Sequence, residues 1–106
     1  MEVTSWGKTY TVAVKEEKYW DNGGLAITMD YFDEEYECWM PFATLTVNLG
    51  RMRYDHAYVD TNNCPWAEEF IAKYGLGKFT GKTCNSGWCT YPLYKFDMAK
   101  IKEAAA

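Results

Sequence analysis

The sequence predicts a small α+β domain with a mainly antiparallel sheet of four to five strands, one packed helix and a short C-terminal helix. Hydrophobic residues alternate with period two along the first half of the chain, and from Cys64 they recur with a period near 3.6. A chain of 106 residues suits one hydrophobic core and is too short for two. Residues 1–106 are therefore expected to form a single domain.

Four strands are expected before the first helix. Their hydrophobic residues alternate, as Tyr10, Val12 and Val14 do in the first of them. The strands are expected at residues 9–15, 25–32, 39–49 and 54–61. The Asn22-Gly23-Gly24 turn favours a hairpin, because glycine tolerates positive φ angles. Short connections of this kind favour an antiparallel sheet over a doubly wound parallel one.

The change of period predicts a helix over residues 64–74. Three aromatic residues spaced four apart form its apolar stripe: Trp66, Phe70 and Tyr74. Asn63 is expected to cap its N-terminus, and Gly75 or Gly77 to end it.

The last third of the chain is expected to continue with a glycine-rich loop over residues 75–87. A final strand follows over residues 88–96. Asp97 is then suited to cap a short helix over residues 98–105, because an aspartate side chain accepts hydrogen bonds from the first turn of a helix.

The net charge of −4 is unevenly distributed along the chain. Residues 19–50 contain no Lys or Arg and six acids, whereas the rest has eleven bases against nine acids. Direct binding to nucleic acid is not expected, because phosphate binding needs clustered bases. An acidic region favours a protein partner with a basic surface, and the alternative is a solvated loop that keeps the protein soluble.

Aromatic residues lie among these acids, so the rings cannot all be buried. Rings beside carboxylates are typical of a protein-binding surface in which the rings anchor and the charges steer. The candidate partner-binding residues are Asp30, Asp33, Glu34, Glu35, Tyr36, Glu37 and Trp39. The alternative is an ordinary hairpin whose rings fold back onto the sheet.

The four cysteines allow a structural zinc site. Cys84 and Cys89 have a C-x4-C spacing across a turn, and Cys64 stands at the start of the expected helix. Cys38 or His56 is the candidate fourth ligand. Free thiols and a disulfide are the alternatives.

Catalysis is not expected, because the chain lacks the common phosphate-binding, metalloprotease and serine-hydrolase motifs. A cysteine-dependent enzyme built from Cys64, the single histidine His56 and Asp60 is the least favoured alternative.

The chain carries no signal of export or membrane insertion. The first residues lack a basic start followed by an apolar run, and no window approaches the roughly 20 apolar residues of a membrane span. The protein is therefore expected in a reducing cytoplasm, where thiols outnumber disulfides.

Two segments carry a family resemblance: residues 60–70 (DTNNCPWAEEF) and residues 86–97 (SGWCTYPLYKFD). Shorter matches lie at residues 22–27 and 41–48. Together they resemble a family of small domains of unknown function carried by phages and conjugative elements of bacteria. The resemblance brings no known reaction with it. The setting implies an accessory protein of a bacterial host cell that inhibits a defence system by binding, as anti-CRISPR proteins do.

The leading hypothesis is therefore a non-enzymatic inhibitor that binds a basic, nucleic-acid-handling protein such as a CRISPR effector. A zinc-stabilised structural or regulatory domain that binds proteins without a defence role is the alternative.

Overall fold

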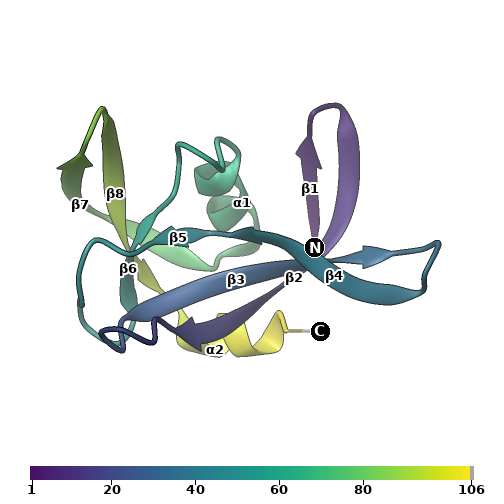
Figure 1. Cartoon of the computed structure of the whole chain (residues 1–106), viewed down its shortest axis with the longest axis horizontal. Coiled ribbons are helices and arrows are strands. Elements are labelled where there is room, and N and C mark those ends of the chain that lie inside the picture. Colours follow the sequence, from purple (N-terminus) through teal and green to yellow (C-terminus); the bar gives the residue numbers. More distant parts are fainter. Residues whose placement is uncertain (106) are drawn as a thin grey trace.

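The computed structural model describes residues 1–105, which form eight β-strands and two short helices (Figure 1). The strands build two antiparallel four-stranded sheets. The predicted class, a small α+β domain with antiparallel strands, a packed helix and a C-terminal helix, is confirmed. The strands are more numerous than predicted, and they form two sheets instead of one.

The first sheet has the order β1-β2-β3-β4. Its strands are β1 (Glu2–Ser5), β2 (Lys8–Lys18), β3 (Leu25–Asp33) and β4 (Cys38–Thr44). The alternation in the sequence explains its buried face, where Val12, Val14, Ile27 and Met29 are at most 2% exposed. β3 and β4 run past the body of the protein and form a long hairpin (Figure 1).

The second sheet has the order β5-β6-β8-β7. Its strands are β5 (Thr46–Val47), β6 (His56–Val59), β7 (Gly77–Ser86) and β8 (Cys89–Phe96). The strand predicted over residues 39–49 is divided at the buried Leu45, where the chain passes from one sheet to the other. Leu45 donates its N–H to the Ile27 carbonyl and accepts from Asp60, which joins the two sheets.

Helix α1 (Ala67–Tyr74) packs on the second sheet and α2 (Met98–Glu103) lies against β2. Phe70 and Ile71 are buried, while Trp66 and Tyr74 are partly buried against the core, so the predicted stripe is confirmed. The predicted cap of α1 is wrong. Trp66 occupies the N-cap position, and the Asn63 side chain donates to Asp60 at 2.9 Å instead.

The predicted C-terminal end of α1 and the predicted N-cap of α2 are confirmed. Gly75 ends α1 in the left-handed region at φ 63°, and the Asp97 side chain accepts from the Lys100 N–H at 3.2 Å.

The glycine-rich loop predicted over residues 75–87 is wrong, because most of it is the edge strand β7. β7 is exposed along almost its whole length, so no buried residues mark it by alternation. The N-terminal strand β1 was not predicted for a similar reason, since it has only four residues and one of them, Val3, is buried.

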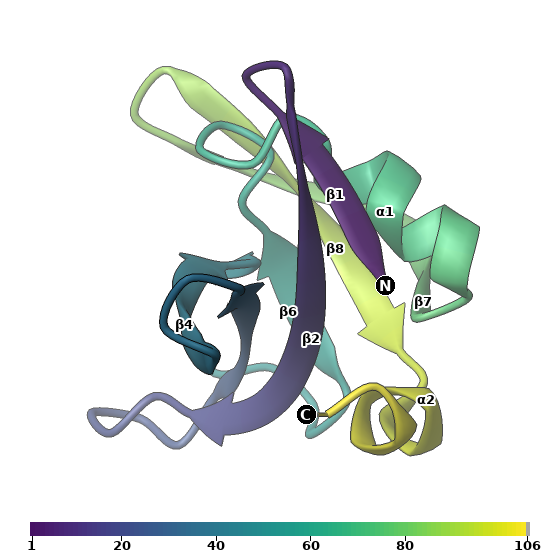
Figure 2. The ribbon, with the colours of Figure 1, turned by 90° about the vertical axis from the view of Figure 1, so that its right-hand side faces the viewer.

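Viewed from the end, as in Figure 2, the β3–β4 hairpin lies nearest the viewer and the β7–β8 hairpin lies at the back. The two hairpins therefore occupy opposite ends of the longest axis, which measures 39 Å. Neither α1 nor α2, the helices formed by residues 1–105, is long and apolar enough to cross a membrane.

Candidate functional site

The acidic residues of the sequence gather at the tip of the β3–β4 hairpin. Asp33 pairs with Cys38 at the end of the ladder, and four residues between them make the turn. Asp33 orders this turn, because its Oδ1 accepts the N–H groups of Glu35 at 2.9 Å and Tyr36 at 3.1 Å. Asp33 therefore shapes the tip rather than standing free to meet a partner.

Glu37 closes the turn in the left-handed region, at φ 52°. This conformation costs a non-glycine residue about 1–2 kcal/mol. A glycine in place of Glu37 would adopt this conformation without the cost. Strained residues of this kind cluster at functional sites.

The tip carboxylates are not neutralised within the protein. Among the ion pairs of residues 1–105, none includes Glu34, Glu35 or Glu37. Asp30 differs, because the Lys15 ammonium lies 3.5 Å from its carboxylate. The seven predicted partner-binding residues therefore divide into two half-buried ones, Asp30 on the sheet and Asp33 at the turn, and five exposed ones: Glu34, Glu35, Tyr36, Glu37 and Trp39.

Two rings accompany the carboxylates. Tyr36 is 70% exposed at the tip, whereas Trp39 is 40% exposed and packs edge-on against Phe32 with the ring centroids 5.5 Å apart. Tyr36 is thus the freer anchor, and Trp39 also supports the hairpin. The exposed acids and rings lie next to one another around the turn, and their role in binding a partner stays a prediction.

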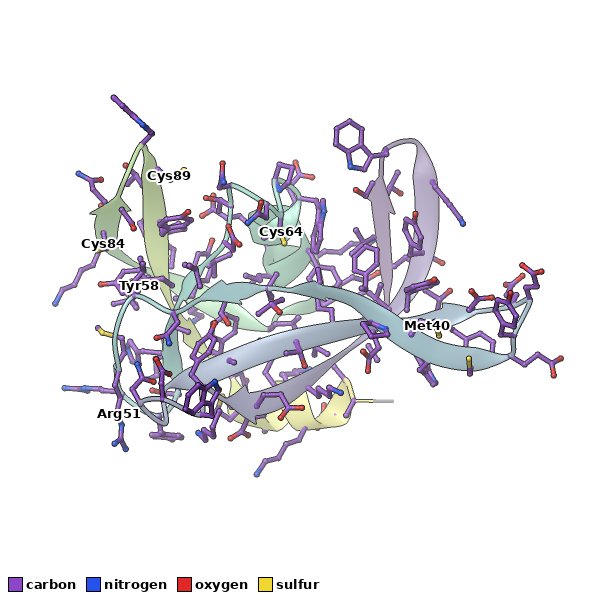
Figure 3. All side chains as sticks on the ribbon, viewed as in Figure 1. Met40, Arg51, Tyr58, Cys64, Cys84 and Cys89 are labelled. Carbon is purple, nitrogen blue, oxygen red and sulfur yellow. The ribbon has the colours of Figure 1, made fainter. Side chains whose placement is uncertain are left out.

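The candidate zinc ligands are dispersed in the structure. Cys84 and Cys89 share one face of the β7–β8 hairpin, and Cys64 lies deep below the loop that precedes α1 (Figure 3). Cys38 begins β4, and its Sγ lies 3.7 Å from the Sδ of Met40, which Figure 3 shows on the side of the molecule away from Cys84 and Cys89. Residues 1–105 contain no group of three or more His, Cys, Asp and Glu side chains placed to hold a metal. The zinc site therefore stays a prediction, with Cys84 and Cys89 as its only neighbouring ligands.

The residues considered for cysteine catalysis are engaged elsewhere. His56 Nδ1 is 2.7 Å from Asp55 Oδ1, the residue beside it, instead of pairing with Asp60. Burial raises the pKa of Asp55, but the hydrogen bond and charge of His56, a backbone hydrogen bond and the charge of Lys95 together bring it below its ordinary value.

Cys64 is 2% exposed, and its Sγ donates to the Thr44 carbonyl at 3.7 Å. Burial, and then the charge of Asp60, raise the pKa of Cys64 to about 11. A nucleophilic cysteine needs a lowered pKa, so this thiol has the opposite environment.

Comparisons with known proteins identify a family and no activity. The family model for the domain of unknown function DUF4313 matches residues 12–106. The chain belongs to this family. No curated protein and no solved structure matches it. The DUF4313 match includes the β3–β4 and β7–β8 hairpins and leaves β1 outside.

Three tryptophans that the sequence interpretation did not single out are fully exposed at hairpin turns. Trp6, Trp20 and Trp88 are each at least 97% exposed. Trp20 and Trp88 lie within the DUF4313 match, and Trp6 precedes it. The signal for two of them was present as Trp6-Gly7 and Gly87-Trp88, because glycine beside a bulky residue between strands marks a tight turn that presents the ring.

Proposed function

We propose that this protein is a non-enzymatic binding protein whose β3–β4 tip docks on the basic surface of a nucleic-acid-handling protein. The observation that supports it is the set of unpaired carboxylates of Glu34, Glu35 and Glu37 around the exposed Tyr36 ring. Carboxylates in this position suit a groove that otherwise holds phosphates, because both are anions that accept hydrogen bonds from Lys and Arg.

The shape of the hairpin supports the same proposal. The tip projects along the longest axis of the molecule, so it can enter a groove without a clash between the two protein bodies (Figure 1). Rings that lose their water on docking contribute more affinity than charges at a wet rim. Tyr36 and Trp39 therefore supply affinity, and the three glutamates supply the rate of encounter.

We extend the proposal to a bacterial defence protein, such as a CRISPR effector, as the partner. This step rests on the resemblance to domains of phages and conjugative elements. A zinc-stabilised regulatory domain without a defence role is the second candidate, favoured only by the shared face of Cys84 and Cys89. Metal analysis of protein purified without chelator separates the two, since a closed structural site holds about one zinc per chain.

The test of the docking surface is binding kinetics against a purified effector. Reversal of the three tip glutamates to lysine is expected to slow association at least about tenfold at low salt, because electrostatic steering sets the rate of encounter. The difference should shrink as the Debye length falls from about 10 Å at 0.1 M to about 3 Å at 1 M salt. Tyr36→Ala should instead speed dissociation.

The matched control reverses two exposed acids outside the hairpin, Glu69 in α1 and Glu103 in α2. Circular dichroism checks that each variant is folded. If the tip variant and the control associate equally fast with the effector, the tip is a solvated turn and the proposal fails.

A further inference from the structure

The β7–β8 hairpin has the opposite charge to the acidic tip. Residues 70–96 contain four lysines and no Asp or Glu. The other seven Lys and Arg residues and all fifteen acids lie outside this segment. Three of these lysines, Lys78, Lys82 and Lys95, lie on the hairpin. No carboxylate of residues 1–105 forms an ion pair with any of them. The hairpin is therefore a basic, solvent-exposed ribbon.

Two of the lysines are placed against each other. Lys78 of β7 lies directly opposite Lys95 of β8 in the ladder. Like charges directly opposite on a sheet destabilise it, and only Lys95 has a carboxylate, Asp55, near enough for its charge to lower that group's pKa. An anion bound between the two ammonium groups would turn this repulsion into attraction.

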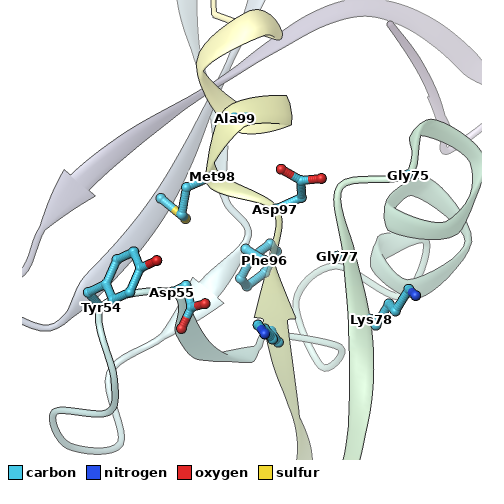
Figure 4. Close-up of a pocket in the computed structure, with 10 residues that line it drawn as sticks. Tyr54, Asp55, Gly75, Gly77, Lys78, Phe96, Asp97, Met98 and Ala99 are labelled. Carbon is cyan, nitrogen blue, oxygen red and sulfur yellow. The ribbon is translucent and has the colours of Figure 1, made fainter.

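The lysine pair lines a cleft at the base of the hairpin, with a volume of about 570 Å³. Figure 4 shows Lys78 on one wall and the ring of Tyr54 on the other. Tyr54 is 73% exposed, so one of its faces is free to stack on a planar group. This volume is within the range of sites that bind a ligand the size of a nucleotide.

Two carboxylates also line the cleft, and both are occupied by internal hydrogen bonds. Asp55 Oδ1 is 2.7 Å from His56 Nδ1, and Asp97 Oδ1 accepts the Lys100 N–H at 3.2 Å. Each carboxylate keeps a second oxygen and its negative charge, so the two acids balance the two lysines in the cleft itself. The positive charge that a phosphate meets lies along the ribbon, where residues 70–96 have no acid.

The far end of the hairpin carries a second free ring. Trp88 follows Gly87, whose φ of 59° belongs to the tight turn, and its side chain is fully exposed. The Trp88 indole lies outside the core, so both of its faces are free to stack on a planar group. The hairpin thus has lysines along its length and an aromatic ring near each end. Proteins that bind single-stranded nucleic acid have this combination: their Lys and Arg side chains contact the phosphates, and their aromatic rings stack on the nucleobases.

We propose that the β7–β8 hairpin binds single-stranded nucleic acid, with Lys78, Lys82 and Lys95 on phosphates and with Trp88 and Tyr54 stacked on unpaired bases. Unpaired bases are required, because a duplex hides the faces that the rings need. The lysines follow the strands instead of surrounding one apolar tip, which favours a nucleic-acid strand over a lipid surface. The inference stands apart from the proposed function, since it concerns a different hairpin and a different ligand.

The test is fluorescence anisotropy of the full chain with a labelled oligothymidylate of about 12 nucleotides at low salt. Three phosphate contacts predict a slope of log K against log salt of about −2, because each contact to a single strand contributes about −0.7. Removing Lys78 and Lys95 together, each by change to Gln, should reduce the slope to about −0.7. Trp88→Ala should weaken binding about fivefold or more, the effect of one lost stacking contact.

Matched controls come from the same chain. Lys100 and Lys102, two exposed lysines of α2, changed to Gln should leave the slope unchanged, as should Trp20→Ala at another exposed turn. The proposal is overturned if the oligonucleotide does not bind, if the control variants lose as much affinity as the hairpin variants, or if duplex or anionic phosphatidylserine vesicles bind and the single strand does not. The assay contains no protein partner, so its outcome is independent of the docking experiment with the acidic tip.

Discussion

The β3–β4 and β7–β8 hairpins are both antiparallel ribbons with an exposed ring at the tip, and they differ in the sign of their charge. No Lys or Arg occurs between Tyr19 and Gly50, a stretch that includes the first hairpin, and no Asp or Glu occurs in residues 70–96, which include the second. They lie at opposite ends of a molecule 39 Å long (Figure 1). The net charge of −4 therefore hides a stretch of charge −6 at one hairpin and a stretch of charge +4 at the other.

This contrast means that a ligand responds to the charge of the surface it approaches, not to the net charge of the protein. At physiological salt the field of a charge is largely screened beyond about 8 Å, so an approaching molecule feels the charge of one hairpin and not that of the other. The expectation that nucleic acid is not contacted directly rests on the lack of clustered Lys and Arg in the sequence, whereas Lys78 and Lys95 become neighbours only through the pairing of β7 with β8. The structure separates the two signs, so an acidic end for a basic protein and a basic end for a nucleic acid are compatible in one small domain.

The base of the β7–β8 hairpin is tightly packed at Gly77, and Gly77→Ala is expected to have the largest effect on stability. A Cβ at Gly77 would lie 2.8 Å from the Lys95 carbonyl oxygen and 3.2 Å from the Phe96 Cα, both backbone atoms. Such overpacking costs about 1–3 kcal/mol, and the upper end is expected because backbone atoms yield little. Urea denaturation measures the loss. A free energy of unfolding equal to that of the parent would show that the base of β7 is loosely packed.

The pH dependence of stability is expected to come from the buried core between the hairpins more than from either charged surface. The folded pKa of Cys64, about 11, lies above its ordinary value of 9.0, so above pH 9 the unfolded thiol releases its proton while the folded thiol keeps it. The unfolded state is then favoured, and the free energy of unfolding falls by up to about 1.4 kcal/mol per pH unit between pH 9 and 11.

Cys64→Ala should remove this part of the slope, and denaturation of both proteins at several pH values measures it. Cys38→Ala is the control, because Cys38 is exposed. Parallel pH profiles for the parent and the Cys64 variant would contradict the prediction.

At the strained turn of the acidic hairpin, a substitution is expected to increase the free energy of unfolding, by less than the changes described above. Glu37→Gly should raise the free energy of unfolding by up to about 1 kcal/mol, because glycine adopts a φ of 52° without the steric cost. Glu37→Gln removes the same charge without this relief and serves as the control. Thermal denaturation compares the two, and equal stability would show that the turn is not strained.

The smallest effect is expected from the tip charges themselves. Glu34→Gln together with Glu35→Gln should change the free energy of unfolding by less than about 0.5 kcal/mol, because exposed carboxylates without ion-pair partners contribute little to stability. A larger change would mean that these residues support the fold, and the contrast between a structural and a binding role at this tip would then disappear.

The elements whose buried faces are periodic could be predicted from the sequence. β2 and β3 alternate around Val12, Val14 and Ile27, and α1 repeats its aromatic residues every four positions, because each element buries one face in the core. The caps at Gly75 and Asp97 were also predictable, since they depend on local backbone conformation and on a side chain three residues away. The grouping of acids and rings at one tip followed from their proximity in the chain.

The tertiary structure alone decided the features that depend on contacts distant in sequence. The edge strand β7 is exposed, so only its pairing with β8 defines it, and that pairing also sets Lys78 against Lys95. The passage of the chain between two sheets at Leu45 depends on hydrogen bonds to Ile27 and Asp60. Spacing along the chain suggested one site from Cys64, Cys84 and Cys89 with Cys38 or His56, whereas in the fold only Cys84 and Cys89 share a face, and Cys38 and Cys64 lie on other segments of residues 1–105.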